Sequence, residues 1–393
     1  MMWPPPAYGG RFAEVTTVVT FLHTADWQLG IKLSYIQGDK GALQREVRVA
    51  TLDRIVAAAT TYHVDFVIVA GDAFDDNGVS DRTVRRAIDR LRMLDPVPVY
   101  FLPGNHDALT ADSVYRRDSF QREKPANVHL LDSCEPVAVP GVNAVLLPCP
   151  LLRRHEVDDP TRHLRADGDR SRVRVGVAHG AMDVLPEAGE CANRIDPACV
   201  ERGELDYLGL GDWHGTWNFG ERIWYSGTHE QTKFSEDNTG NVLVVSIEGS
   251  GSRPAVRPVR VAQTTWMRHE TELNGEDDIS ALEAWYESVA DRESTLVELI
   301  LRGTLGLPQR ERLDALLRRQ EDRLRWQRVV DDELVATASL DDLDGIASGG
   351  FVRAAIERLR EEAETPGAEG AADACRALQL LYRLHRGMGA AVE

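Results

Sequence analysis

The stretch DFVIVAGD, residues 65–72, combines two features that indicate the fold of this chain. Its apolar residues occupy both alternations, which is typical of a strand buried on both faces of a sheet. A glycine and an aspartate follow directly. Since ligands in open α/β sheets collect at the carboxyl ends of strands, we expect Asp72 to lie at a binding edge.

Four further stretches repeat this order of apolar strand, polar ligand-type residue, and glycine or tight turn. They are TADWQ (24–28), PGNHD (103–107), VAHG (177–180) and GDWHG (211–215). Taken alone, each motif also fits an ordinary turn or helix cap. Together they predict one shared metal site. Asp, Asn and His side chains suit Mn²⁺, Mg²⁺, Fe²⁺ or Zn²⁺, and the thiolates of a structural zinc site are missing.

The pattern around these motifs predicts an α/β fold. Up to about residue 260, short apolar runs alternate with amphipathic stretches such as 42–63 and 81–95. The early part is βαβαβ and the later part is rich in strands. This order favours mixed sheets packed face to face with helices outside.

Composition limits the partners and the location. The formal net charge of −18 repels nucleic acid on average, so binding DNA requires a local basic surface or metal ions. No run approaches 18 apolar residues, and the proline-rich start lacks the apolar core of a signal peptide. The five cysteines show no C-x-x-C spacing and are interpreted as free thiols in a reducing cytoplasm.

We predict four segments along the 393 residues. A composition shift at 250–262 ends the first large domain, and a smaller α/β pattern and two amphipathic helices follow. The segments are a flexible tail (1–15), a catalytic domain (16–262), an α/β cap domain (263–345) and a C-terminal helical region (346–393).

In this order, the motifs resemble those of the calcineurin-like metallophosphoesterases. HTADWQLG, GDAFDDNGVSD and FLPGNHD are most similar to the SbcD-type DNA repair nucleases. The resemblance covers roughly residues 20–230, and a weaker likeness continues into the cap-like segment. It implies a four-layer sandwich of two mixed sheets flanked by helices, and a metal-dependent DNA exonuclease or endonuclease.

The resemblance also implies roles for individual residues. Two divalent metal ions would be bridged by Asp72, and His106 would lie outside them beside the leaving oxygen, with Asp107 a candidate to orient it. The implied ligands are Asp26, Gln28, Asp72 and His214 for the first metal, and Asp72, Asn105, His179 and Asp212 for the second.

Two ligand positions depart from the family pattern. Gln28 and Asp212 stand where the family carries histidines, so each metal loses one imidazole. The site becomes richer in oxygen, which favours Mn²⁺ or Mg²⁺ over Zn²⁺ or Fe²⁺. Gln28 is interpreted either as a weak ligand or as one that acts through water. The alternative is a decayed site that no longer cuts.

The leading hypothesis is the nuclease subunit of an SbcCD-like DNA repair complex. One alternative is a phosphodiesterase or phosphatase for a small phosphoester, and another is a non-catalytic subunit that binds DNA ends or a partner. The resemblance implies docking of the C-terminal helices on an SMC-like coiled-coil ATPase, and a homodimer. Residues 301–328 hold eight arginines against four acids and could face a phosphate backbone.

Overall fold

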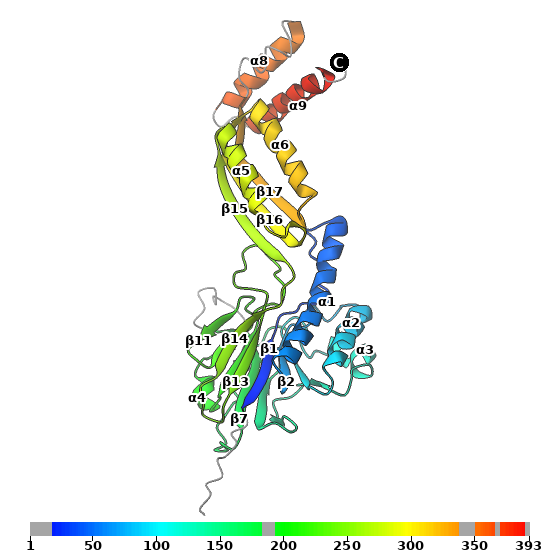
Figure 1. The fold of residues 1–393 in the computed structure, drawn as a ribbon, viewed down its shortest axis with the longest axis vertical. Coiled ribbons are helices and arrows are strands. Elements are labelled where there is room, and N and C mark those ends of the chain that lie inside the picture. The colour runs from blue at the N-terminus through cyan, green and yellow to red at the C-terminus, as the bar shows by residue number, and fades with distance from the viewer. Residues whose placement is uncertain (1–17, 183–192, 338–349, 366–369, 390–393) are drawn as a thin grey trace, which may run out of the picture. The chain divides into compact units, whose positions relative to one another are not determined.

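The computed structural model describes residues 18–182, 193–337, 350–365 and 370–389 (Figure 1). The predicted N-terminal tail, Cys191 and the end of the predicted cap domain lie outside these residues. The chain divides into two units, Met1–Gln263 and Thr264–Glu393. The helices α8 and α9 belong to the second unit together with its sheet. Each unit is described by itself.

The strands of the first unit form two six-stranded sheets and a two-stranded ribbon. In chain order they are β1 (Val19–Thr24), β2 (Phe66–Ala70), β3 (Val99–Leu102), β4 (Val128–Leu130), β5 (Val137–Ala138), β6 (Ala144–Cys149), β7 (Val173–His179), β8 (Ala181–Met182), β9 (Arg194–Ile195), β10 (Tyr207–Gly211), β11 (Trp217–Phe219), β12 (Ile223–Tyr225), β13 (Asn241–Ile247) and β14 (Ala255–Arg260).

Both large sheets are mixed. The first has the order β14-β13-β1-β2-β3-β4, and its strands β1 to β4 run parallel. The second has the order β11-β12-β10-β7-β6-β5, with a parallel core of β12, β10, β7 and β6. The predicted linker at 250–262 contains the edge strand β14. The two mixed sheets confirm the α/β sandwich expected from the sequence.

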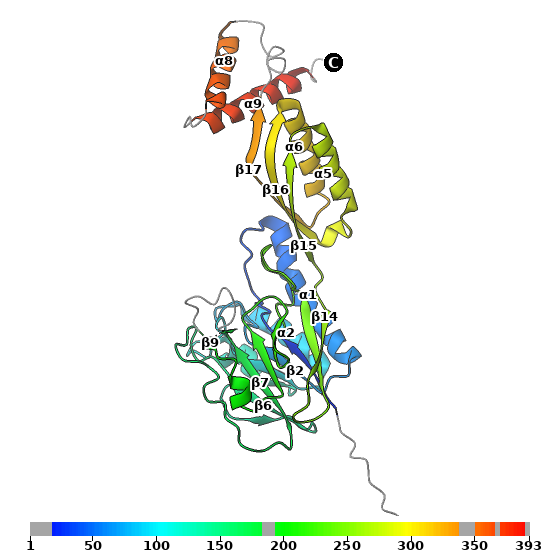
Figure 2. The same cartoon turned by 90° about the vertical axis from the view of Figure 1, so that its left-hand side faces the viewer.

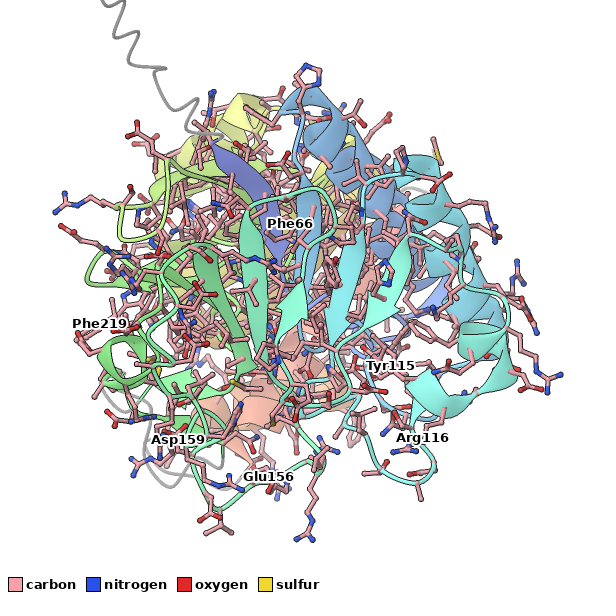
Figure 3. The ribbon with its side chains drawn as sticks, turned by 90° about the horizontal axis from the view of Figure 1, so that it is seen from below. Phe66, Tyr115, Arg116, Glu156, Asp159 and Phe219 are labelled. Atoms are coloured by element: carbon pink, nitrogen blue, oxygen red, sulfur yellow. The ribbon has the colours of Figure 1, made fainter. Side chains whose placement is uncertain are left out.

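The strand β2 shows why the sheets stack. Phe66, Ile68 and Ala70 face a core shared with the second sheet, and Val67 and Val69 face the helices. All five residues are buried, as the doubly apolar pattern predicts. Figure 3 labels Phe66 among the strands of this unit.

Helices cover the outer face of the first sheet (Figure 1). The described helices of this unit are α1 (Gly38–Thr61), α2 (Asp81–Leu91), η1 (Arg92–Leu94), η2 (Val114–Arg116), α3 (Asp118–Gln121) and α4 (Cys199–Arg202). Among the described residues, the outer face of the second sheet has only the one-turn helix α4. This agrees with the helix-poor pattern of the later sequence.

The second unit is a three-stranded parallel sheet with helices. Its elements are β15 (Thr265–Leu273), α5 (Glu276–Ser288), η3 (Arg292–Ser294), β16 (Thr295–Gly306), α6 (Leu307–Glu321), β17 (Trp326–Thr337), α8 (Gly350–Glu364) and α9 (Ala371–Gly389). The helices α5 and α6 pack on one face of the sheet, through a core that includes Leu282, Leu299 and Leu316 (Figure 2).

The arginines of residues 301–328 are mostly engaged within this unit. Six of the eight form ion pairs with its carboxylates. Arg310, for example, lies 2.6 Å from Asp331 and 2.9 Å from Asp314. A guanidinium paired in this way has less charge to offer a phosphate backbone, so the arginine excess seen in the sequence is largely balanced by folding.

The apolar stripes of α8 and α9 are partly buried within the same unit. Ile356 and Leu378 are buried against Leu307. Phe351 and Leu380 are exposed, and the side chain of Tyr382 lies outside the described part of the chain. A search of the described helices finds none long and apolar enough to cross a membrane.

Candidate metal centre

Three buried residues from three strand ends converge on one point. Asp26 follows β1, Asp72 follows β2, and His179 is the last residue of β7 in the other large sheet. One potential ligand atom from each lies within 4.8 Å of the other two. The centre therefore sits where the edges of both sheets meet, as the strand-end motifs predicted.

The backbone at the predicted ligands is unusual. Of the ten described non-glycine residues with a positive φ, four are predicted ligands: Asp26 (53°), Gln28 (41°), Asp72 (52°) and Asp212 (103°). Such conformations cost free energy for L-residues and cluster at functional sites. Hydrogen bonds fix two of them across strand ends, because the Asp26 N–H donates to Gly71 O at 3.1 Å and the Gln28 N–H to Asp72 O at 2.8 Å.

Glycines allow the loops that carry the predicted ligands to lie close to one another. A Cβ at Gly71 would lie 2.1 Å from Nδ1 of His179, and one at Gly104 would lie 2.2 Å from Oδ1 of Asp72. At Gly211 it would lie 2.1 Å from the carbonyl oxygen of Ala70. The glycines before Asp72, Asn105 and Asp212 are therefore a steric requirement of the centre.

The His179 side of the centre is rich in oxygen. The imidazole Nδ1 lies 2.9 Å from the carbonyl oxygen of Ala70, so that nitrogen donates and Nε2 faces the centre. Nε2 lies 2.9 Å from Oδ1 of Asn105, 3.5 Å from Oδ1 of Asp72 and 3.7 Å from Oδ1 of Asp212. Two carboxylates, an amide oxygen and one imidazole nitrogen are a donor set that fits a hard divalent cation.

Charge at this side is tuned by burial and proximity. Burial alone would lower the pKa of His179, but the carboxylates of Asp72, Asp26 and Asp212 raise it to about 9. Burial raises the pKa of Asp26. Its two oxygens accept from the backbone N–H of Asp212, at 3.0 and 3.2 Å. A bound cation would relieve this concentration of buried acids.

The His214 side is built differently. Nδ1 of His214 lies 2.6 Å from Oε1 of Glu236, and Nε2 lies 3.2 Å from Nε2 of Gln28. With its proton on Nδ1 toward the carboxylate, the imidazole accepts the Gln28 amide N–H at Nε2. Gln28, which stands where the family resemblance expects a histidine, thus forms a hydrogen bond with Nε2 of His214, the nitrogen that would bind a metal.

Sequence reasoning missed Glu236, which lies in no strand-end motif. Its Oε2 accepts the backbone N–H of Thr232 at 2.7 Å, and Oε1 accepts the Thr232 hydroxyl at 2.5 Å. Burial would raise the pKa of Glu236, but the contacts with His214 and Thr232 hold it at about 2. A permanent carboxylate behind an imidazole orients the ring and increases its basicity.

His106 lies beside the cluster and is partly open to solvent. Its side chain is 28% exposed, and Nε2 lies 4.0 Å from Oδ2 of Asp72. Nδ1 donates to the carbonyl oxygen of Asp75 at 2.6 Å. The backbone N–H of His106 donates to Oδ1 of Asp72 at 2.9 Å, which ties this loop to the centre.

Asp107 connects two loops. It accepts from Gly104 N–H at 2.7 Å, from Phe74 N–H at 3.1 Å and from the Tyr115 hydroxyl at 2.6 Å. The contact that orients the His106 ring comes instead from the Asp75 carbonyl. Asp107 thus supports the loop that carries Asn105 and His106.

The structure brings all nine predicted site residues to one edge of the sandwich. Asp26, Asp72, Asn105, His179 and Asp212 form the His179 side. Gln28 and His214 face each other on the second side, and His106 and Asp107 lie in the adjoining loop.

A buried arginine fixes the first ligand loop from behind. Arg48 of α1 is 1% exposed and donates to the carbonyl oxygens of Trp27 at 2.7 Å and Glu230 at 2.6 Å. Trp27 is fully buried, and its indole N–H donates to the Thr24 hydroxyl at 2.8 Å. Trp27 therefore packs under the loop and is not open to a nucleobase.

Comparison with known proteins finds a family match and relatives of this chain. Residues 19–214 match the model of the calcineurin-like phosphoesterase family. An uncharacterized metallophosphoesterase of Bacillus subtilis (strain 168), YhaO, is 24% identical over 373 residues, 85% of this chain and 86% of that protein. Among solved structures, TT1561 of Thermus thermophilus matches with a TM-score of 0.36 and 11% identity, over 62% of this chain and all of that chain.

Proposed function

The chain belongs to the calcineurin-like metallophosphoesterases, and on that basis we propose that it is a metal-dependent nuclease that hydrolyses phosphodiester bonds of DNA. The proposal includes a place as the nuclease subunit of an SbcCD-like repair complex in the cytoplasm. The observation that carries it is the partly exposed His106 beside the buried Asp26, Asp72 and His179 cluster.

The residues present have the chemistry that phosphodiester cleavage requires. Divalent metal ions, when bound, neutralise charge on phosphate oxygens and lower the pKa of water. The chain supplies hard ligands to hold them, through Asp72, Asn105, His179 and Asp212. In its doubly protonated form, His106 keeps the Nδ1 proton on the Asp75 carbonyl oxygen and can donate the Nε2 proton to the departing oxygen.

Support for DNA as the substrate comes from the rest of the chain. The motifs around Asp26, Asp72 and Asn105 resemble those of SbcD-type nucleases. A second α/β unit and two further helices exceed what a small phosphoester needs. The relative from Bacillus subtilis also aligns over most of both chains, so it shares this length.

The C-terminal helices support a protein partner. Phe351 of α8 is 89% exposed, and Leu380 and Leu384 of α9 are also exposed. Such side chains suit the groove of a coiled-coil ATPase of the SMC type. Light scattering of the chain alone and with such an ATPase would show whether a homodimer and a complex form.

The test is a substrate panel with Mn²⁺ and with Mg²⁺. Linear duplex DNA, single-stranded DNA, bis(p-nitrophenyl) phosphate and p-nitrophenyl phosphate are compared, beside a His106→Ala control. Cleavage of DNA that is lost in the control is the expected result. Cleavage of the small esters without DNA would favour a small-substrate phosphodiesterase. Metal binding by folded protein without any cleavage would favour a non-catalytic subunit.

A further inference from the structure

A cavity of about 430 Å³ adjoins the metal centre. Its inner wall includes Gln28, His106 and His214, and its outer wall comes from the loops 31–35 and 232–233. A group bound there would lie next to a phosphate held at the centre. The volume of this cavity suits one or two nucleotide units and is too small for the surface of a protein partner.

Two lysines line this cavity, Lys32 and Lys233. The whole chain contains only four lysines, at positions 32, 40, 124 and 233, and the other 41 of its 45 basic residues are arginines. Half of the lysines therefore gather at one small cavity beside the predicted ligands. One carboxylate, that of Asp75, also lines it.

The two lysines differ from the arginines of the second unit. Arg302, Arg310 and Arg312 are ion-paired with carboxylates of their own unit. For Lys32 and Lys233, the described residues include no carboxylate within ion-pair distance, and both side chains are exposed. Their charge is available to a ligand.

The backbone around both lysines is held in place. Arg45 donates to the carbonyl oxygen of Lys32 at 3.0 Å, and Gln231 donates to that of Lys233 at 2.7 Å. The Tyr35 hydroxyl donates to the carbonyl oxygen of Thr232, which joins the two loops. The ammonium groups thus project from a fixed frame, which limits the ordering cost of binding.

We propose that Lys32 and Lys233 form a subsite that binds the phosphates flanking the scissile one, so that the enzyme selects an oligonucleotide strand over an isolated phosphodiester. This inference rests on the proposed function. Lysine ammonium groups bind phosphate as point charges with three donors each. In a chain of net charge −18, this local pair supplies the basic surface that a nucleic acid requires.

The experiment uses the full-length chain and the variants Lys32→Ala, Lys233→Ala and their double. Lys124→Gln is the matched control, since it removes the same charge from a lysine that does not line the cavity. Binding of fluorescein-labelled oligo(dT) is measured without divalent metal across a salt series. The kcat/KM values for oligo(dT) and for bis(p-nitrophenyl) phosphate are measured with Mn²⁺.

We expect the salt slope of oligo(dT) affinity to fall by about 0.7 for each lysine removed, as for the loss of one single-strand phosphate contact. The ratio of kcat/KM for oligo(dT) to that for the small diester should fall about tenfold per lysine, the effect of one charge-assisted hydrogen bond. Lys124→Gln should retain both wild-type values.

An unchanged slope and ratio in the double variant would overturn the subsite, as would equal losses in Lys124→Gln. In a parallel assay with nucleoside polyphosphates, a lower kcat/KM in the lysine variants together with an unchanged kcat/KM for oligo(dT) would show a small polyphosphate substrate and would also overturn the subsite. Failure of the wild-type chain to cleave either substrate would refute the proposed function, while the metal-free binding series would still test the lysines.

Discussion

The two histidines of the centre, His179 and His214, have different partners. The Nδ1 of His179 donates to a backbone carbonyl, and its Nε2 faces the oxygens of Asn105, Asp72 and Asp212. The Nδ1 of His214 faces the carboxylate of Glu236, and its Nε2 faces an amide nitrogen. Nε2 of His179 therefore faces oxygen atoms that could bind a cation together with it, whereas Nε2 of His214 faces an amide nitrogen, which could not.

This difference shows that the two departures from the family pattern act in opposite directions. Asp212 adds a negative charge to a side that already has hard ligands. Gln28 removes an imidazole and fills the Nε2 of the remaining one. We therefore expect unequal affinities, with the tighter cation on the His179 side, and four measurements would test this difference.

The largest effect is expected for Asp72→Asn, because Asp72 is a buried carboxylate of the His179 side and the ligand predicted to bridge both metals. The amide keeps the shape and an oxygen for the His106 N–H, but loses the charge. We expect phosphodiester cleavage to fall by about a thousandfold, as when a main electrostatic stabiliser is removed. Calorimetric titration with Mn²⁺ should show loss of the tight site. Retention of that site with a normal melting temperature would contradict the assignment.

The next effect is the pH dependence of the tight site. The pKa of His179 is about 9 without metal, so the imidazole holds a proton below that pH, and a cation must displace it. Metal affinity should therefore rise with pH, by about tenfold per unit for one displaced proton, and level off above pH 9. Titrations in buffers of different ionisation enthalpy would count the protons released. An affinity that stays constant from pH 6 to pH 8 would refute the expectation.

A smaller effect is expected for Gln28→His. The left-handed backbone at this position (φ of 41°) is tolerated by histidine better than by most residues. The new imidazole restores a ligand and frees Nε2 of His214, so affinity at the second side should rise by about tenfold or more. Spin-resonance counting of bound Mn²⁺ measures this, and Gln121→His, on the exposed end of α3, serves as the control. An unchanged second affinity would show that Gln28 does not limit this side.

The smallest effect is expected for Glu236→Gln, which acts through His214 as a positioning residue. Loss of the carboxylate partner should weaken metal at the His214 side by about tenfold and leave the His179 side unchanged. A titration that resolves two affinities distinguishes this from a general loss of structure, which would weaken both. Glu236→Asp should recover part of the loss, and failure to do so would argue against the carboxylate contact.

Much of the centre could be predicted from sequence because its pattern is local. An apolar run such as FVIVA forms a buried strand, and the next polar residue must lie at the sheet edge. The glycines at 71, 104 and 211 belong to the same short motifs, since only a residue without Cβ fits there. The local motifs therefore predicted the five polar residues of the His179 side, which are Asp26, Asp72, Asn105, His179 and Asp212.

The direct contacts between side chains could not be predicted from local patterns, because they join distant positions. Only the family resemblance had assigned Gln28 and His214 to one metal. Gln28 and His214 are 186 positions apart, and Arg48 reaches the carbonyl oxygen of a residue 182 positions away. Glu236 has no strand before it and belongs to no motif. Whether an arginine pairs with a carboxylate or remains available likewise depends on packing, as residues 301–328 show.

The α/β sandwich, the polar residues at the strand ends and the family resemblance follow from the amino-acid order alone, since strand periodicity and steric demands on glycine act over a few residues. Packing was needed to show that Gln28 occupies His214, that Glu236 stands behind it, and that Lys32 and Lys233 share one cavity. Those contacts depend on distances of a few ångströms between remote segments, and such distances exist only once the sheets have packed.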